Sequence, residues 1–193
     1  MSVTLRCAVE SDLPALLEIY APYVRETTVS FEYEPPGPAQ FRERFFKVTA
    51  QFPWLAVEKN GRLAGYAYAS APFPRQAYQW LAESAIYVAP GFQGQGLGGA
   101  LAGALETVLA RQGYRRLYAV ITAANIGSLA FHRARGYEET AVFPEAGYKH
   151  GQWLAVVWLA KALNRTAGQP RPPAPFKSLD PRWVAGVLRA EAA

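Results

Sequence analysis

The sequence has little of what metal centres, disulfide frameworks and membrane proteins require. Among its 193 residues there are one cysteine and two histidines. The single cysteine, Cys7, has no partner for a disulfide within the chain, so we expect a reduced, cytoplasmic setting. Two distant histidines and one cysteine cannot form a zinc site from these ligands alone, and we expect no metal. No apolar run approaches the ~20 residues needed to cross a bilayer, and the first residues lack the layout of a signal peptide, so we expect no membrane partner.

Positive charge is present but not concentrated. The formal net charge is +5, and the densest basic group, at 111–116, holds only three arginines. Proteins that bind nucleic acid gather such residues on one face, so we expect no nucleic-acid partner. An apolar fraction of 51% is ample for a packed core and favours one compact domain.

Apolar periodicity divides the chain into alternating strands and helices. It predicts helices at about 13–24, 39–49, 98–112 and 125–135, and strands at 3–9, 54–58, 63–71, 80–88, 117–122, 142–143 and 153–159. Pro22 is expected to bend or divide the first helix. Antiparallel hairpins followed by a strand–loop–helix–strand crossover indicate an α/β fold with a mixed, mostly antiparallel sheet and helices on both faces.

The composition changes after Leu163. Residues 164–175 hold four prolines and few large apolar side chains, which favours a linker or mobile tail. A short helix is expected at 181–192, with Trp183, Val187 and Leu188 available to dock on the body or on a partner. The sequence thus predicts a domain at 1–163 and a tail at 164–193.

The most informative segment is a strand, a glycine-rich turn and a helix at 86–98, Ile-Tyr-Val-Ala-Pro-Gly-Phe-Gln-Gly-Gln-Gly-Leu-Gly. Glycines allow close approach of the backbone, and the free N–H groups of a helix N-terminus attract an anion such as pyrophosphate. No Lys-Ser or Lys-Thr pair follows the glycines, and the segment lies after antiparallel strands, which argues against a P-loop and a dinucleotide fold. From this segment alone, a turn that merely starts a helix remains an alternative.

The motif Gln93-x-x-Gly96-x-Gly98 resembles the acetyl-CoA motif of the GNAT superfamily of acetyltransferases. A second segment, which runs from Asn125 to Tyr137, resembles the other half of that site. The resemblance implies acetyl-CoA as co-substrate and a sheet splayed at the strand that binds its pantetheine arm. The cofactor-binding residues that it implies are Tyr87, Val88, Gln93, Gly94, Gln95, Gly96, Leu97, Gly98, Asn125, Ser128 and Phe131.

Three further segments, at 28–35, 75–88 and 146–153, resemble the phosphinothricin and methionine sulfone/sulfoximine N-acetyltransferases. The match spans about residues 5–163. It implies transfer of an acetyl group to the amino group of a small amino-acid-like substrate, and a homodimer, since the resembling enzymes are commonly dimers. The substrate-binding residues that we predict are Phe31, Arg75, Glu83, Ser84 and Tyr87.

Acetyl transfer to an ammonium group requires a base, and Glu83 is the first candidate. It interrupts an otherwise apolar strand, where partial desolvation would raise its pKa as a base requires. The resemblance implies the same role, and the alternative is a solvent-facing glutamate at a strand edge. His132 is the second catalytic candidate, as a general acid towards coenzyme A, as a second base, or as a packing residue only. Backbone N–H groups near Val88 are the expected oxyanion donors, and direct transfer in a ternary complex is expected because Cys7 is remote.

The acceptor is harder to predict than the reaction. Arg75 is a candidate clamp for the substrate's oxyanion groups, with a surface arginine as the alternative. Phe31 and Tyr87 either wall the pocket or belong to the core. Phe73 and the pair Leu154-Ala155 replace polar residues common in the resembling enzymes, which favours methionine sulfone over phosphinothricin. Acetylation of a protein or peptide, and a non-catalytic acetyl-CoA-binding module, remain as alternative functions.

Overall fold

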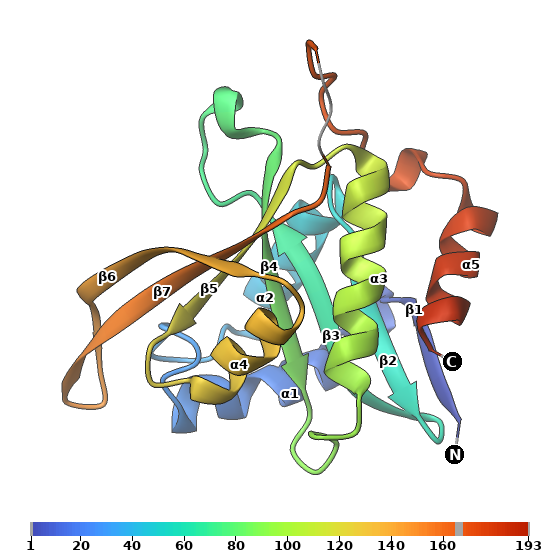
Figure 1. Cartoon of the computed structure of the whole chain (residues 1–193). Coiled ribbons are helices and arrows are strands. Elements are labelled where there is room, and N and C mark those ends of the chain that lie inside the picture. Colours follow the sequence, from blue (N-terminus) through green and yellow to red (C-terminus); the bar gives the residue numbers. More distant parts are fainter. Residues whose placement is uncertain (1, 165–167, 193) are drawn as a thin grey trace.

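The computed structural model describes residues 2–164 and 168–192, and a single seven-stranded sheet forms its centre (Figure 1). The strands lie in the order β1-β2-β3-β4-β5-β7-β6, and every neighbouring pair is antiparallel except β4 and β5. Their bounds are Val3–Cys7 (β1), Trp54–Lys59 (β2), Arg62–Ser70 (β3), Leu81–Val88 (β4), Arg116–Thr122 (β5), Glu138–Lys149 (β6) and Gln152–Ala162 (β7).

Helices cover both faces of this sheet, as predicted. Helices α1 (Leu13–Glu26) and α2 (Pro38–Thr49) pack against β2, β3 and β4 on one face, and α3 (Leu97–Gln112) packs on the other face. Helix α4 (Ile126–Ala134) lies beside β5, and α5 (Pro181–Glu191) packs on α3 and β1. Three short 3-10 helices complete the elements: η1 (Glu10–Asp12), η2 (Gln76–Tyr78) and η3 (Phe176–Ser178). Within the described ranges, no helix is long and apolar enough to span a membrane.

Of the two outcomes predicted at Pro22, a bend or a division, the division does not occur. Helix α1 runs through Pro22 as one helix, because a proline removes only one backbone donor and the apolar face still packs on the sheet. The last two strands are much longer than predicted. Their period-2 pattern is interrupted by register shifts at Glu139/Ala141 and Phe143/Gly147, and by Glu145 with a φ of 49°. A β-bulge inserts an extra residue, so the side chains after it change faces and the apolar–polar alternation of the sequence is interrupted. The strand still pairs with its partner on both sides of the bulge.

The C-terminal segment is held to the domain by hydrogen bonds. Trp80 Nε1 donates to the Arg171 carbonyl at 2.8 Å, and the Ala174 N–H donates to the Gln112 carbonyl at 2.8 Å. In α5, the predicted docking residue Leu188 is buried together with Val184, and the other two, Trp183 and Val187, are partly buried and pack against the core. The part of the tail that the structure describes is therefore packed on the body, while the division at residue 163 remains a prediction.

We expect Leu188→Ala to lower the free energy of unfolding by about 2–4 kcal/mol, because it removes a buried leucine from the contact of α5 with α3 and β1. Arg189→Ala is the matched control, since Arg189 is exposed and the change leaves that contact intact. Urea denaturation measures both. A loss below about 0.5 kcal/mol for Leu188→Ala would mean that α5 is not docked.

Candidate active site

The site lies where strands β4 and β5 separate. Their parallel pairing comprises three residue pairs, the last of which joins Glu83 to Tyr118, and β4 then continues to Val88 without a partner on that side. The Ala89 N–H donates to the Ala64 carbonyl of β3. Because backbone groups alternate in direction along an antiparallel strand, those of Ile86 and Val88 face away from β3, into the gap.

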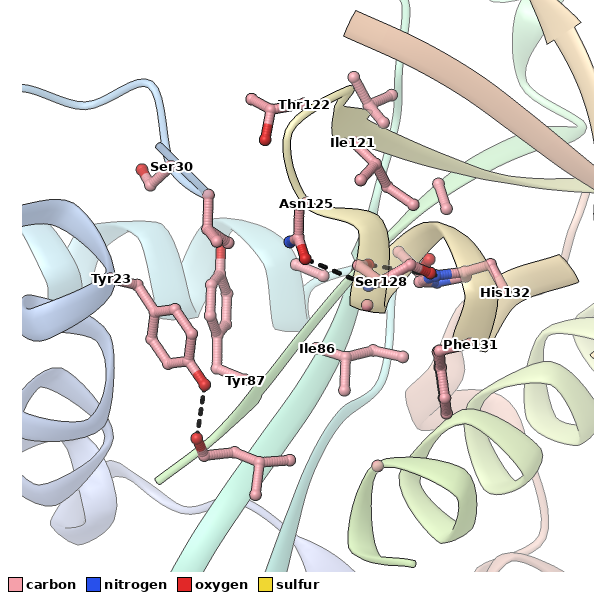
Figure 2. A pocket seen from close by; sticks show the side chains of 18 of the residues that line it. Tyr23, Ser30, Ile86, Tyr87, Ile121, Thr122, Asn125, Ser128, Phe131 and His132 are labelled. Carbon is pink, nitrogen blue, oxygen red and sulfur yellow. Dashed lines mark hydrogen bonds between the residues drawn. The ribbon is translucent and has the colours of Figure 1, made fainter. Parts of the chain in front are cut away.

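A cavity of about 920 Å³ fills this gap. Residues from β4, β5, α4, the glycine-rich loop and the loop after α1 line it. Figure 2 shows Tyr23 and Tyr87 on one side of it, and Asn125, Ser128 and His132 on the other. The predicted site residues that line it are Phe31, Glu83, Ser84, Tyr87, Val88, Gln93, Gly94, Gly98, Asn125, Ser128, Phe131 and His132.

The glycine-rich loop has the backbone that an anion site needs. Gly91, Gly94 and Gly96 adopt φ values of 84°, 70° and 80°, which an L-residue with a side chain rarely adopts. Gly96 is the N-cap of α3, and no side chain caps that helix, so its first N–H groups remain available. A pyrophosphate placed there would also meet the positive end of the helix dipole.

Two predicted members of the cofactor set have structural roles beside the cavity rather than in its wall. Leu97 is 2% exposed and belongs to the hydrophobic core. Gln95 donates to the Gly91 carbonyl at 2.8 Å and accepts a hydrogen bond from Lys59, which ties the loop to itself and to β2. With Gly96 as the cap, these residues shape the loop, while Gln93, Gly94 and Gly98 face the cavity.

Asn125 begins α4 and presents its side chain to the cavity. Its Oδ1 accepts the Ser128 N–H at 3.1 Å, which is the hydrogen bond of an N-cap. The side-chain oxygen of Asn125 is engaged in this cap, and its side-chain N–H groups remain as donors for a ligand. Ser128 and Phe131 line the cavity one turn further along the helix.

His132 is a buried, neutral acceptor. Its Nδ1 lies 2.9 Å from the Ser128 carbonyl, which only accepts, so Nδ1 carries the proton and Nε2 presents a lone pair. Burial lowers the pKa of His132, which disfavours the imidazolium form. Of the three roles predicted, this tautomer fits a second base or a packing residue better than a general acid, and the role of His132 stays a prediction.

Glu83 is the last paired residue before β4 and β5 separate. It faces Ser70 on β3 and Tyr118 on β5, and its half-buried carboxyl group lines the cavity. Burial raises its pKa above the ordinary glutamate value. No lysine or arginine is among the residues that line the cavity, so no cation there opposes this shift.

Among the predicted substrate-binding residues, Arg75 is the one that does not line the cavity. It is exposed at the start of η2, in the loop between β3 and β4. Phe73, in the same loop, stacks on Trp158 at 5.6 Å instead of narrowing the pocket. Leu154 and Ala155 also lie outside the lining. The substrate clamp and the preference for methionine sulfone therefore stay predictions.

The sequence reasoning missed the hydroxyl groups that surround the cavity. Tyr23 of α1 donates to the Val88 carbonyl at 2.6 Å and accepts from Gln93 Nε2 at 2.9 Å, which links α1 to both parts of the cofactor site. Thr122 at the end of β5 and Tyr68 on β3 also line the cavity. No local motif identified them, because only the tertiary fold brings them to β4.

Two buried polar atoms in the wall of the cavity lack a partner. Among the described residues, Thr122 Oγ1 and His132 Nε2 are buried side-chain atoms without a hydrogen bond. Each atom has less than 1 Å² of accessible surface, so a ligand in the cavity would reach it only after a local side-chain movement. The free strand edge and the glycine-rich loop suit a ligand that carries a pyrophosphate on a long polar arm.

Comparisons with known proteins identify the family. Residues 13–137 match the model of the acetyltransferase (GNAT) family, and the chain belongs to that family. It is 40% identical over 166 residues to a phosphinothricin N-acetyltransferase of Alcaligenes faecalis, covering 83% of each chain. It is 32% identical over 173 residues to an L-methionine sulfoximine/L-methionine sulfone acetyltransferase of Pseudomonas aeruginosa, covering 88% of this chain and 100% of that one.

A solved structure supports the same conclusion. The phosphinothricin acetyltransferase from Sinorhizobium meliloti in complex with acetyl-CoA superposes with a TM-score of 0.85 at 36% identity, covering 92% of this chain and 100% of that one. The predicted co-substrate is thus the molecule bound in that neighbour. The predicted family, fold class and acetyltransferase activity are confirmed.

We expect Gly65→Ala to weaken acetyl-CoA binding by about tenfold. A Cβ at Gly65 on β3 would lie 2.7 Å from the Tyr87 carbonyl oxygen and 3.2 Å from the Val88 Cα, so β4 would have to shift. Gly186→Ala, in α5, is the matched control because its Cβ would meet nothing within 4 Å. Isothermal titration with acetyl-CoA measures both affinities. Equal affinities would show that the position of β4 does not determine cofactor binding.

Proposed function

We propose that the protein transfers the acetyl group of acetyl-CoA to the amino group of a small amino-acid-like acceptor, by direct transfer in a ternary complex. The observation that carries this proposal is one half-buried carboxyl group, Glu83, at the point where the cofactor strand leaves its neighbour. It lies in the same cavity as the free edge of β4 and the glycine-rich loop.

The cavity wall offers complementary groups along the length of acetyl-CoA. The glycine-rich loop and the first N–H groups of α3 suit the pyrophosphate. The backbone groups of Ile86 and Val88, with the Asn125 amide and Ser128, suit the polar pantetheine arm. When bound, acetyl-CoA supplies a thioester carbonyl, whose oxygen gains negative charge as the amine attacks.

Proton transfer is assigned to Glu83. An amine with an ordinary pKa is mostly protonated at neutral pH, and a carboxylate with a raised pKa can accept its proton, directly or through a water molecule. Backbone N–H groups near Val88 are the proposed oxyanion donors. As the amide forms, the attacking nitrogen gives up its second proton, and the departing thiolate of coenzyme A takes up a proton to leave as the free thiol. For His132 we propose a hydrogen-bond acceptor for the acceptor amine, in keeping with its neutral tautomer.

Hydroxyl groups line the part of the cavity near Glu83 and Phe31. They belong to Ser30, Tyr68, Ser70 and Ser84, and those of Ser30 and Ser84 are also bonded to Tyr20 and to the Tyr118 carbonyl. These suit the oxygen atoms of phosphinothricin, methionine sulfone or methionine sulfoximine, the substrates named for the relatives. Because Phe73 and Leu154 lie outside the cavity lining, we propose this class of acceptor without a preference within it. Arg75 does not line the cavity of a single chain, so it could hold the substrate only if its loop moved or if a second subunit placed it there.

Other proposals concern assembly and setting. The exposed aromatic residues of the last hairpin, Phe143, Tyr148 and Trp153, suit a homodimer interface. A free Cys7 and an intracellular co-substrate suit the cytoplasm.

We expect no nucleic-acid partner because the basic residues are scattered. Acetylation of a peptide and a non-catalytic acetyl-CoA-binding role are the alternatives that the assay below separates.

The decisive assay measures release of coenzyme A with a thiol reagent, using methionine sulfone, methionine sulfoximine, phosphinothricin and a lysine peptide as acceptors. We expect turnover of at least one of the first three, and a loss of about 10²–10⁴-fold in Glu83→Gln with acetyl-CoA binding retained. Turnover of the peptide alone would favour the protein-acetyltransferase alternative. No turnover with acetyl-CoA still bound would favour the non-catalytic alternative.

The pH dependence of kcat/KM tests the base separately. Burial raises the pKa of Glu83, so its carboxylate form is lost at a higher pH than for an exposed glutamate, ordinarily about 4.3. Activity should therefore fall as the pH drops through this raised pKa, and Glu83→Gln should remove that limb. A limb that persists in Glu83→Gln would assign the base to another group.

A further inference from the structure

The turn of the last hairpin packs on the loop that roofs the acceptor end of the cavity. What we call the hairpin turn, at 147–151, comprises the last residues of β6 and the two residues that lead into β7. The roof loop, at 27–33, is the first part of the connection between α1 and α2. Tyr33 Oη donates to the Tyr148 carbonyl at 2.6 Å, and His150 Nε2 lies 3.3 Å from the Thr27 carbonyl. We call these contacts, with those of Lys149 and Gly147 described next, the clasp.

Lys149 is the central contact of the clasp. Its side chain is buried, with the residue 2% exposed, and Nζ donates to the Val24 carbonyl at 2.7 Å and to the Ser30 carbonyl at 2.6 Å. Val24 is in the last turns of α1 and Ser30 is in the roof loop, so one ammonium group fixes the loop relative to the helix. Charged hydrogen bonds to buried carbonyls are among the stronger kinds.

Gly147 supplies the second contact. A Cβ at this position would lie 2.3 Å from Cε2 of Phe31, so the ring of Phe31 lies directly against the hairpin backbone. Phe31, Val29 and Ser30 are the roof-loop residues that line the cavity. On the side of α1, the Tyr20 hydroxyl group forms a hydrogen bond of 2.7 Å with Ser30 Oγ. The roof loop is thus held between α1 and the hairpin turn.

We propose that the clasp sets the size of the acceptor that the enzyme accepts, with Lys149 as a positioning residue that holds Phe31 and Ser30 over the amine site. We expect a roof loop held in this way to admit a small amine more readily than an extended chain. The clasp therefore selects amino-acid-like acceptors against peptides. This inference rests on the proposed function for the identity of the acceptor, but the clasp itself can be tested without any acceptor.

The test compares Lys149→Met with the wild type in two measurements. Lys149→Met removes both hydrogen bonds and keeps an unbranched apolar side chain. Hydrogen exchange of the roof-loop amides should become faster, with no change at the start of α3. The KM for methionine sulfone should rise about tenfold, while the KM for acetyl-CoA stays within about twofold. The rate with an alanine tetrapeptide, relative to the rate with methionine sulfone, should increase. Lys47→Met, on the exposed face of α2, is the control and should change neither measurement.

Gly147→Ala tests the same roof without altering Lys149, in case Lys149→Met fails to fold. Its Cβ displaces the Phe31 ring, which is the end of a flexible side chain, and the same rise in the acceptor KM is expected. Unchanged exchange in Lys149→Met would overturn the clasp. Faster exchange with unchanged acceptor preference would overturn its role in selection. If the wild type acetylates none of these amines while exchange still responds to Lys149→Met, the proposed acceptor class is wrong and the clasp stands.

Discussion

The end of pairing between β4 and β5 after Glu83 is the feature on which the rest of the site depends. A sheet normally satisfies its backbone groups, and leaving them unpaired in a buried place costs free energy. Here Ile86 and Val88 turn their backbone groups towards a cavity instead of a strand. Antiparallel pairing with β3 on the other side keeps β4 straight, and Gly65 lets the two strands approach closely. The sheet is thus incomplete at the position where a linear, amide-containing ligand can complete it.

Local signals made much of this predictable. A glycine-rich turn between a strand and a helix, an asparagine that caps the next helix, and one carboxylate in an apolar strand are each visible within a few residues. They indicated Gly94, Asn125 and Glu83, and all three line the cavity. The order of strands and helices was also predictable, because hairpins and the crossover limit how neighbouring elements can pack.

What could not be predicted depends on contacts between distant segments. Tyr23 meets Val88 across 65 positions, and Lys149 meets Val24 across 125, so no sequence pattern relates them. Arg75 was assigned to the pocket from resemblance, but the course of an exposed loop is set by packing, here by the stacking of Phe73 on Trp158. The β6–β7 hairpin was underestimated because its register shifts interrupt the alternation that marks a strand.

The distribution of charge suggests how the two substrates are kept apart. The anionic part of acetyl-CoA suits the N-terminus of α3, where the attraction comes from backbone dipoles, and the cavity lining holds no lysine or arginine. A cation beside Glu83 would lower its pKa and weaken it as a base. We infer that the ammonium group of the acceptor is itself the cation that Glu83 attracts. The carboxylate would first bind that group and then take its proton. An arginine within the cavity would compete with that ammonium group for the carboxylate.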